Sequence, residues 1–78
     1  MTDTTLDKVT ALVATATGKL TTEIKPDTNL IDDLTLDEID RIELIYALEN
    51  EFRIQIDETS AETLETVADI VRYIEACI

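Results

Sequence analysis

The chain contains no histidine, no tryptophan and only one cysteine, Cys77. A single cysteine excludes a disulfide within the chain, and no basic residue neighbours Cys77 in the sequence to activate its thiol. Without histidine, the remaining candidates for acid–base catalysis are surface carboxylates that nothing in the sequence buries. We therefore expect that the protein is not an enzyme.

Turn-forming and aromatic residues are also scarce: the sequence has one glycine, one proline, two tyrosines and one phenylalanine. A β-sheet protein needs more of both kinds, whereas aliphatic side chains dominate the 45% hydrophobic content here. The 78 residues suffice for one small core and not for a large buried catalytic cavity. The composition therefore predicts a single all-α domain that spans residues 1–78.

Basic residues are few: six Lys and Arg face eighteen Asp and Glu, which gives a net charge of −12 at pH 7. This balance excludes binding to nucleic acid and to an anionic membrane surface, since both need clustered basic residues. Opposite charges steer association, so a basic protein surface is the expected partner. No apolar stretch approaches membrane-spanning length, and the first ten residues hold no basic leader. We expect a cytoplasmic monomer without membrane insertion.

The spacing of apolar residues predicts three long helices and one short one. Their expected ranges are 4–17, 35–51, 58–64 and 66–76. Gly18 is placed to end the first helix, and Thr66 with Asp69 forms a capping-box pattern at the start of the last. A long loop that holds the only proline, Pro26, joins the first two helices and predicts a bundle other than a simple hairpin.

The second predicted helix has the widest apolar face. This face consists of Ile39, Ile42, Ile45, Leu48 and Phe52, and is extended by Leu44. For the whole chain, the predicted core residues are Leu6, Val9, Val13, Leu30, Ile42, Ile45, Leu48, Phe52, Ile54, Leu64, Val67, Ile70 and Ile74.

The segment 29–52, "NLIDDLTLDEIDRIELIYALENEF", resembles the acyl carrier proteins. In that family an Asp-Leu-Gly-x-Asp-Ser-Leu-Asp pattern is followed by Val-Glu-Leu, an Ala-Leu-Glu stretch and Glu-Phe. The resemblance continues upstream through "TTEIKPDTNLIDDL" and downstream through "IQIDETSAETLETVADIVRYI". It implies an acyl-carrier-protein-like four-helix bundle with a long first loop and a short third helix. Such proteins carry acyl chains between enzymes of fatty-acid or polyketide synthesis.

The family's cofactor, a 4′-phosphopantetheine arm, is a phosphodiester on the serine of Asp-Ser-Leu. The matching residues here are Asp37, Glu38 and Ile39, so the serine is replaced by Glu38. A carboxylate is a weak nucleophile, and its product with the pyrophosphate of coenzyme A would be a labile mixed anhydride. Neither Thr35, which stands where the family has glycine, nor Ser60 occupies the motif position. We expect no cofactor at Glu38.

Three interpretations of Glu38 are open. Thr35 and Glu38 match a capping box at the start of the second helix, in which each side chain would bond the other's backbone N–H. The carboxylate could also imitate the single negative charge of the phosphodiester. A third hypothesis is that glutamate was introduced by design to prevent modification.

The resemblance implies a surface for basic partner enzymes, and four acids match its positions: Asp37, Asp40, Glu43 and Glu49. Glu51 is expected to add to them, and further acids continue the charge onto the third helix. The predicted partner-binding residues are Asp37, Asp40, Arg41, Glu43, Glu49, Glu51, Asp57, Glu58 and Glu62. Arg41 is the one base among them and is expected to weaken or redirect some contacts. The alternative is a solvated helix face, the usual role of charged runs. A calcium site is not expected, because the acids lack the EF-hand spacing and its glycine.

Two functional hypotheses follow from the resemblance. In the first, the protein is a serine-less relative of the acyl carrier proteins with a binding or regulatory role. In the second, it is a true carrier whose attachment serine has been replaced by engineering, or whose attachment site lies elsewhere.

Overall fold

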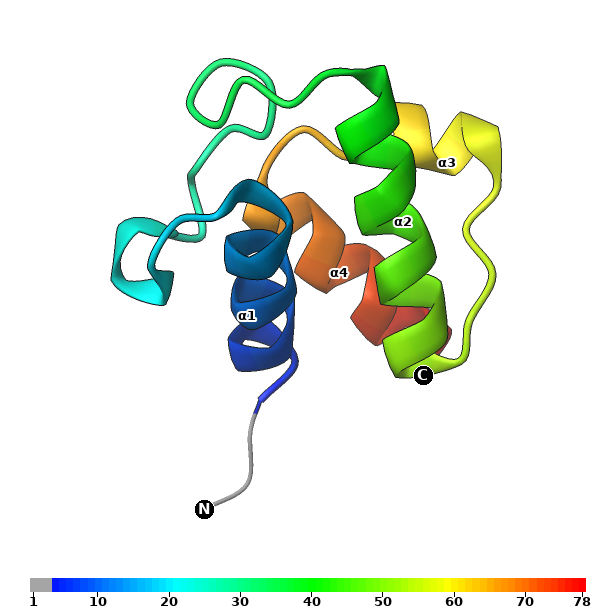
Figure 1. Ribbon diagram of the computed structural model, residues 1–78. Helices are drawn as coiled ribbons and strands as arrows, with labels where there is room; N and C mark the ends of the chain where they lie inside the picture. The colour runs from blue at the N-terminus through cyan, green and yellow to red at the C-terminus, as the bar shows by residue number, and fades with distance from the viewer. Residues whose placement is uncertain (1–3) are drawn as a thin grey trace.

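The computed structural model describes residues 4–78, and over this range the chain is helical (Figure 1). The helices are α1 (Thr5–Thr17), α2 (Glu38–Phe52), α3 (Glu58–Glu62) and α4 (Val67–Cys77), with a 3₁₀ turn, η1 (Thr21–Glu23), in the first loop. The β-type pairing in the described range is one isolated bridge between Asn29 and Thr66. The predicted all-α bundle with a long first loop and a short third helix is therefore confirmed.

Two of the predicted helix ends are confirmed by their capping interactions. Gly18 follows α1 in the left-handed conformation, with φ of 72°, and its N–H donates to the Ala14 carbonyl. Thr66 and Asp69 form the predicted capping box at the start of α4. The predicted start of the second helix at residue 35 was three residues too early, and the short helix ends at Glu62 rather than at residue 64.

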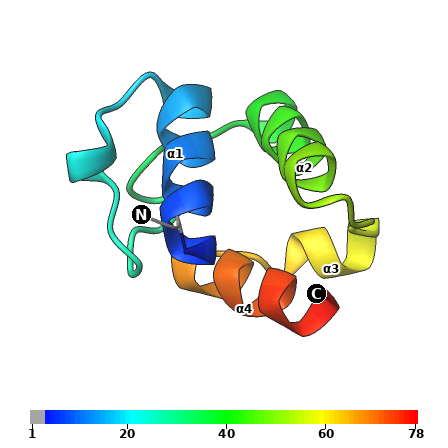
Figure 2. The same cartoon turned by 90° about the horizontal axis from the view of Figure 1, so that it is seen from below.

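The helix α1 packs against both α2 and α4, while α3 lies between α2 and α4 (Figure 2). Backbone hydrogen bonds attach the long first loop to the segment that leads into α4. The N–H of Leu30 donates to the Glu65 carbonyl at 2.8 Å, and the N–H of Ala68 donates to the Pro26 carbonyl at 2.8 Å. The loop is thus held against the bundle and delivers the chain to the start of α2.

Helices α1, α2 and α4 supply core residues, and the loops contribute nearly as many. The buried apolar residues are Val9, Val13, Ala14, Ile24, Leu30, Leu34, Leu36, Leu44, Leu48, Ile56, Leu64, Val67, Ile70 and Ile74. The short helix α3 contributes no buried residue. Among the residues described, no helix has the length and apolarity that crossing a bilayer requires.

Most of the predicted core is confirmed, with one error on α2. Eight predicted residues are buried: Val9, Val13, Leu30, Leu48, Leu64, Val67, Ile70 and Ile74. Leu6, Ile45, Phe52 and Ile54 are partly buried and pack against this core. Ile42 was placed wrongly, because 46% of its surface is exposed. The inward face of α2 is centred on Leu44 and Leu48, and Ile42 lies roughly 200° around the helix from Leu44.

Candidate functional site

The start of α2 is set by Asp37, whose carboxylate accepts a hydrogen bond from the N–H of Asp40 at 2.8 Å. Glu38 is therefore the first residue of the helix and not the third. The predicted capping box between Thr35 and Glu38 is wrong. Thr35 has a φ of 50°, outside the extended region that an N-cap residue needs, and its hydroxyl donates to the Leu34 carbonyl.

The conformation of Thr35 follows from the burial of its two neighbours. Leu34 and Leu36 are both buried, and the N–H of Leu36 donates to the Leu30 carbonyl at 3.2 Å. The chain must turn sharply to place both leucines in the core, and Thr35 takes the left-handed conformation at this turn. The helix can begin only after Leu36, which makes Asp37 the cap.

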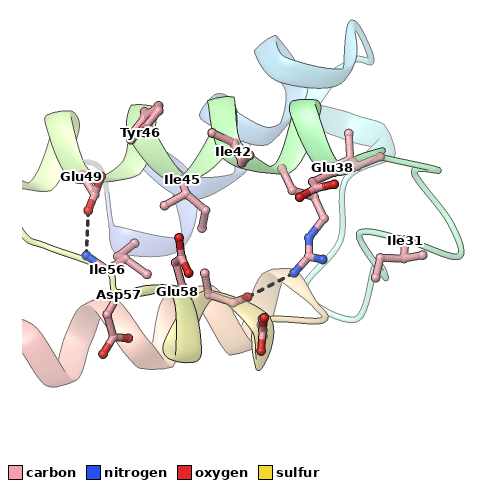
Figure 3. A pocket seen from close by; sticks show the side chains of 13 residues that line it. Ile31, Glu38, Ile42, Ile45, Tyr46, Glu49, Ile56, Asp57 and Glu58 are labelled. Carbon is pink, nitrogen blue, oxygen red and sulfur yellow. Dashed lines mark hydrogen bonds between the residues drawn. The ribbon is translucent and has the colours of Figure 1, made fainter.

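Glu38 is exposed, and its carboxylate lies at the positive end of the α2 dipole. This placement stabilises the helix by roughly 0.3–1 kcal/mol, as for other acids in a first turn. Figure 3 shows Glu38 at one end of a groove that runs along α2. An exposed side chain at this place is open to a partner protein.

The groove lies between α2 and α3 and has a volume of about 710 Å³ (Figure 3). Its apolar lining is Ile31, Leu36, Ile42, Ile45, Ile56 and Ala61, with the ring of Tyr46. Its charged lining is Glu38, Arg41, Glu49, Asp57, Glu58 and Glu62. An apolar surface bordered mainly by carboxylates is the chemical character of this site.

Two side chains of α2 reach across the groove to the chain around α3. The guanidinium of Arg41 donates from Nη2 to the Ala61 carbonyl at 3.2 Å, and Oε2 of Glu49 accepts from the N–H of Ile56 at 2.8 Å (dashed lines in Figure 3). Arg41 and Glu49 are both half-buried. Because they lie about two turns apart on one face of α2, they hold the two ends of the segment 56–61.

These contacts change what two of the predicted partner-binding residues can do. The charged group of Arg41 is directed to the carboxyl end of α3, where a cation is favourable, and not outward among the acids. One oxygen of Glu49 is used within the fold. Both residues thus have structural contacts that the sequence pattern did not indicate.

The other predicted acids lie at or near the surface. Asp37, Glu43, Glu51, Asp57, Glu58 and Glu62 are exposed, and Asp40 is half-buried. Asp57 is the N-cap of α3 and accepts the N–H of Ser60 at 2.8 Å. Hydrogen bonds from Ser60 lower the pKa of the Asp57 carboxyl below its ordinary value. These hydrogen bonds therefore favour the charged form of the Asp57 carboxyl.

Three exposed apolar residues on α2 form a strip, although the spacing of apolar residues placed one of them, Ile42, in the core. Ile39 and Tyr46 each expose 66% of their surface, and Ile42 exposes 46%. At about 100° per residue, the three lie within roughly 60° of one another and opposite Leu44 and Leu48. The sequence already indicates that some apolar residues of α2 are exposed. They occur around the whole helix, and a single face cannot bury them all.

Acidic residues of α2 flank this apolar strip on both sides. By the same helical geometry, Glu43 lies on the side away from α3, whereas Glu38 and Glu49 lie on the side of the groove. Glu58 and Glu62 of α3 line the same groove as Glu38 and Glu49 and extend the acidic margin on that side. The surface is therefore an apolar strip with acidic margins.

Comparison with known proteins gives one consistent family. The family described as "Phosphopantetheine attachment site" matches residues 7–74. The acyl carrier protein of Helicobacter hepaticus is 42% identical over 72 residues, which cover 92% of this chain and 95% of that protein. That of Clostridium acetobutylicum is 44% identical over 70 residues, covering 90% and 91% of the two chains.

Solved structures give the same result. A candidate acyl carrier protein from Mycobacterium tuberculosis matches with a TM-score of 0.88 at 25% identity, covering 96% of this chain and all of that one. The acyl carrier protein from Enterococcus faecalis matches with a TM-score of 0.79 at 32% identity, covering 92% and 91%. The chain belongs to the acyl carrier protein family.

Proposed function

We propose that this protein binds enzymes that process acyl chains and does not carry a 4′-phosphopantetheine arm at Glu38. Its role is then one of binding or regulation within fatty-acid or polyketide-type synthesis. The observation that carries the proposal is the presence of glutamate at the exposed first position of α2, where the family pattern that the sequence resembles has the attachment serine.

The nearby hydroxyl groups give further support. The hydroxyl of Thr35 donates to the Leu34 carbonyl, and its backbone is left-handed. Ser60 is half-buried in α3, across the groove from the start of α2. Neither side chain is presented from the first turn of α2 as Glu38 is. We therefore expect that a transferase reading this motif has no acceptor.

The surface of α2 supports the binding part of the proposal. An exposed apolar strip gives a contact area that water leaves on association, and the acidic margins complement a basic partner. Charge complementarity mainly raises the association rate and falls with ionic strength. Binding should therefore weaken as salt is added.

Modification is tested by mass spectrometry after incubation with coenzyme A and a promiscuous phosphopantetheinyl transferase. The parent protein should gain no mass, whereas Glu38→Ser should gain one arm. If the parent is modified, the chain is a true carrier, and peptide mapping identifies the hydroxyl. If Glu38→Ser folds and stays unmodified, the recognition surface has diverged at further residues, with Thr35 and Arg41 as the first to restore.

Binding is tested by competition in a second assay, with an enzyme that loads acyl chains onto acyl carrier proteins. An acyl carrier protein that has the serine serves as substrate, and the parent protein is added as an inhibitor. The proposal expects competitive inhibition that weakens with salt, that is lost in Glu43→Lys and that persists in Glu75→Lys. Both variants change the charge equally, and Glu75 lies on α4 away from the groove. Absence of inhibition by the parent would contradict the docking role.

A further inference from the structure

The groove between α2 and α3 combines an apolar floor with an excess of negative charge. Five carboxylates line it, against the single guanidinium of Arg41. The charge of Arg41 is directed to the Ala61 carbonyl at 3.2 Å, and the ion pair found within residues 4–78 lies on α4, outside the groove. The carboxylates of the groove therefore remain available to a cationic ligand.

The charges lie at both ends of the groove, and the apolar side chains lie between them. Figure 3 shows Glu38 at one end, Glu49 and Asp57 at the other, and Ile42 and Ile45 in between. Glu49 follows Glu38 by eleven residues, a rise of roughly 16 Å along α2. A ligand that uses the whole groove thus needs a long apolar middle and a positive charge at each end.

This arrangement discriminates against simpler ligands. A molecule with an anionic head, such as a fatty acid, would face like charges at both ends. A single metal ion would gain nothing from the apolar floor, and residues 4–78 hold no cluster of three or more metal-ligating side chains. A cation with one charged head would leave the carboxylates at the far end without a partner.

We propose that the groove binds a linear aliphatic amine with a positive charge at each end, that is, a terminal diamine or a polyamine. Its methylene chain lies on Ile42 and Ile45, and its ammonium groups lie at Glu38 and at Glu49 with Asp57. The volume of about 710 Å³ is within the usual range for small-molecule sites. This binding goes beyond the proposed function, because it needs no partner enzyme and no arm at Glu38.

A series of dications with equal charge tests the site. Diaminobutane, diaminooctane and diaminododecane, each with its amines at the two ends, are titrated into the protein by calorimetry, with magnesium as the compact dication. Because each methylene that leaves water adds to affinity, diaminododecane should bind at least roughly ten-fold more tightly than diaminobutane or magnesium. Equal affinity for all four would mean that they only screen the net charge, and would overturn the proposal.

Variants at the two ends locate the ammonium groups. Glu38→Gln and Asp57→Asn each remove one charge, and asparagine still caps α3. Each should weaken diaminododecane roughly two- to five-fold, the effect of one exposed ion pair, whereas Glu75→Gln on α4 should not. Equal effects of the groove variants and Glu75→Gln would overturn the placement of the charges in the groove.

Variants of apolar residues locate the methylene chain. Ile42→Ala should weaken diaminododecane several-fold and leave magnesium unchanged, because the metal ion does not use the apolar floor. Leu20→Ala, which removes an exposed apolar side chain outside the groove, should change neither ligand. If Ile42→Ala binds diaminododecane as the parent does, the chain does not lie in the groove and the proposal is wrong.

Discussion

The carboxylate of Asp37 accepts the N–H of Asp40 at 2.8 Å, and this bond makes Asp37 the residue that starts α2. Its consequence is that Glu38 stands at the first helical position with its side chain exposed. The N-cap residue and Glu38, which the resemblance aligns with the family's attachment serine, are thus separate residues. Substitutions at the two positions should therefore have different effects on stability.

Replacing Asp37 with alanine should lower the free energy of unfolding by about 1 kcal/mol, the usual cost of losing an N-cap. For a domain of this size that corresponds to a fall in melting temperature of roughly 4–8 °C. Asp37→Asn should retain most of the stability, since asparagine is an equally good cap. Urea and thermal unfolding, followed by circular dichroism, measure the unfolding free energy and the melting temperature of the two variants. Equal loss in the two variants would show that the cap bond is unimportant.

Glu38→Ser should destabilise the protein less than Asp37→Ala does. Because no capping box exists, serine loses only the favourable charge at the helix start, worth roughly 0.3–1 kcal/mol and less in high salt. Unfolding in parallel with the Asp37 variants, at low and at high ionic strength, checks this. A loss for Glu38→Ser that exceeds that for Asp37→Ala, or that persists unchanged in salt, would contradict it.

Predictions from the sequence are wrong where long-range packing overrides the local pattern of residues. Gly18 and the Thr66–Asp69 pair were predictable because their capping depends on neighbours in the chain. Thr35 was not, because its left-handed backbone is imposed by the burial of Leu34 and Leu36 against distant residues.

In the candidate site, too, local features could be predicted from the sequence, whereas contacts between distant residues could not. The exposed acids were recognisable from composition and from the family pattern. The bonds from Arg41 to Ala61 and from Glu49 to Ile56 join α2 to the segment around α3, and their partners follow from tertiary structure. Ile42 was misplaced because an apolar face read from spacing does not say which side of α2 meets α1.

Raising the ionic strength should raise the melting temperature. The net charge of −12 on a small domain is self-repelling, and salt screens exposed charges that are farther apart than about 10 Å at 0.1 M. Magnesium at millimolar concentration should act in the same direction. A series of melts in sodium chloride and in magnesium chloride measures the effect. A constant melting temperature across both series would show that repulsion does not limit stability.

The contribution of Asp69 to stability should disappear in acid. The hydrogen bond from Arg72, and those from the backbone of Thr66 and Glu65, lower the pKa of this carboxyl in the folded protein below the ordinary 3.8. A lowered folded pKa means that the contribution is complete above about pH 3.8 and is lost as pH falls through the folded pKa. Asp69→Asn should thus be less stable than the parent at pH 7, and the difference should shrink below pH 3.8. A pH-independent difference in urea unfolding would exclude this linkage.

Ile42 and Leu44 should separate binding from stability. Leu44 is 1% exposed, so Leu44→Ala should cost roughly 2–5 kcal/mol of unfolding free energy. Ile42 is 46% exposed, so Ile42→Ala should cost only about 1 kcal/mol, because nearly half of the side chain's surface stays in water in the folded protein. In the competition assay the order should reverse: Ile42→Ala should weaken inhibition several-fold, since the side chain lies in the apolar strip. Leu20→Ala, which removes an exposed apolar side chain that lies outside α2 and does not line the groove, should leave inhibition unchanged. If Ile42→Ala inhibits as well as the parent does, the apolar strip is not part of the contact, and the acidic margins alone would have to account for binding.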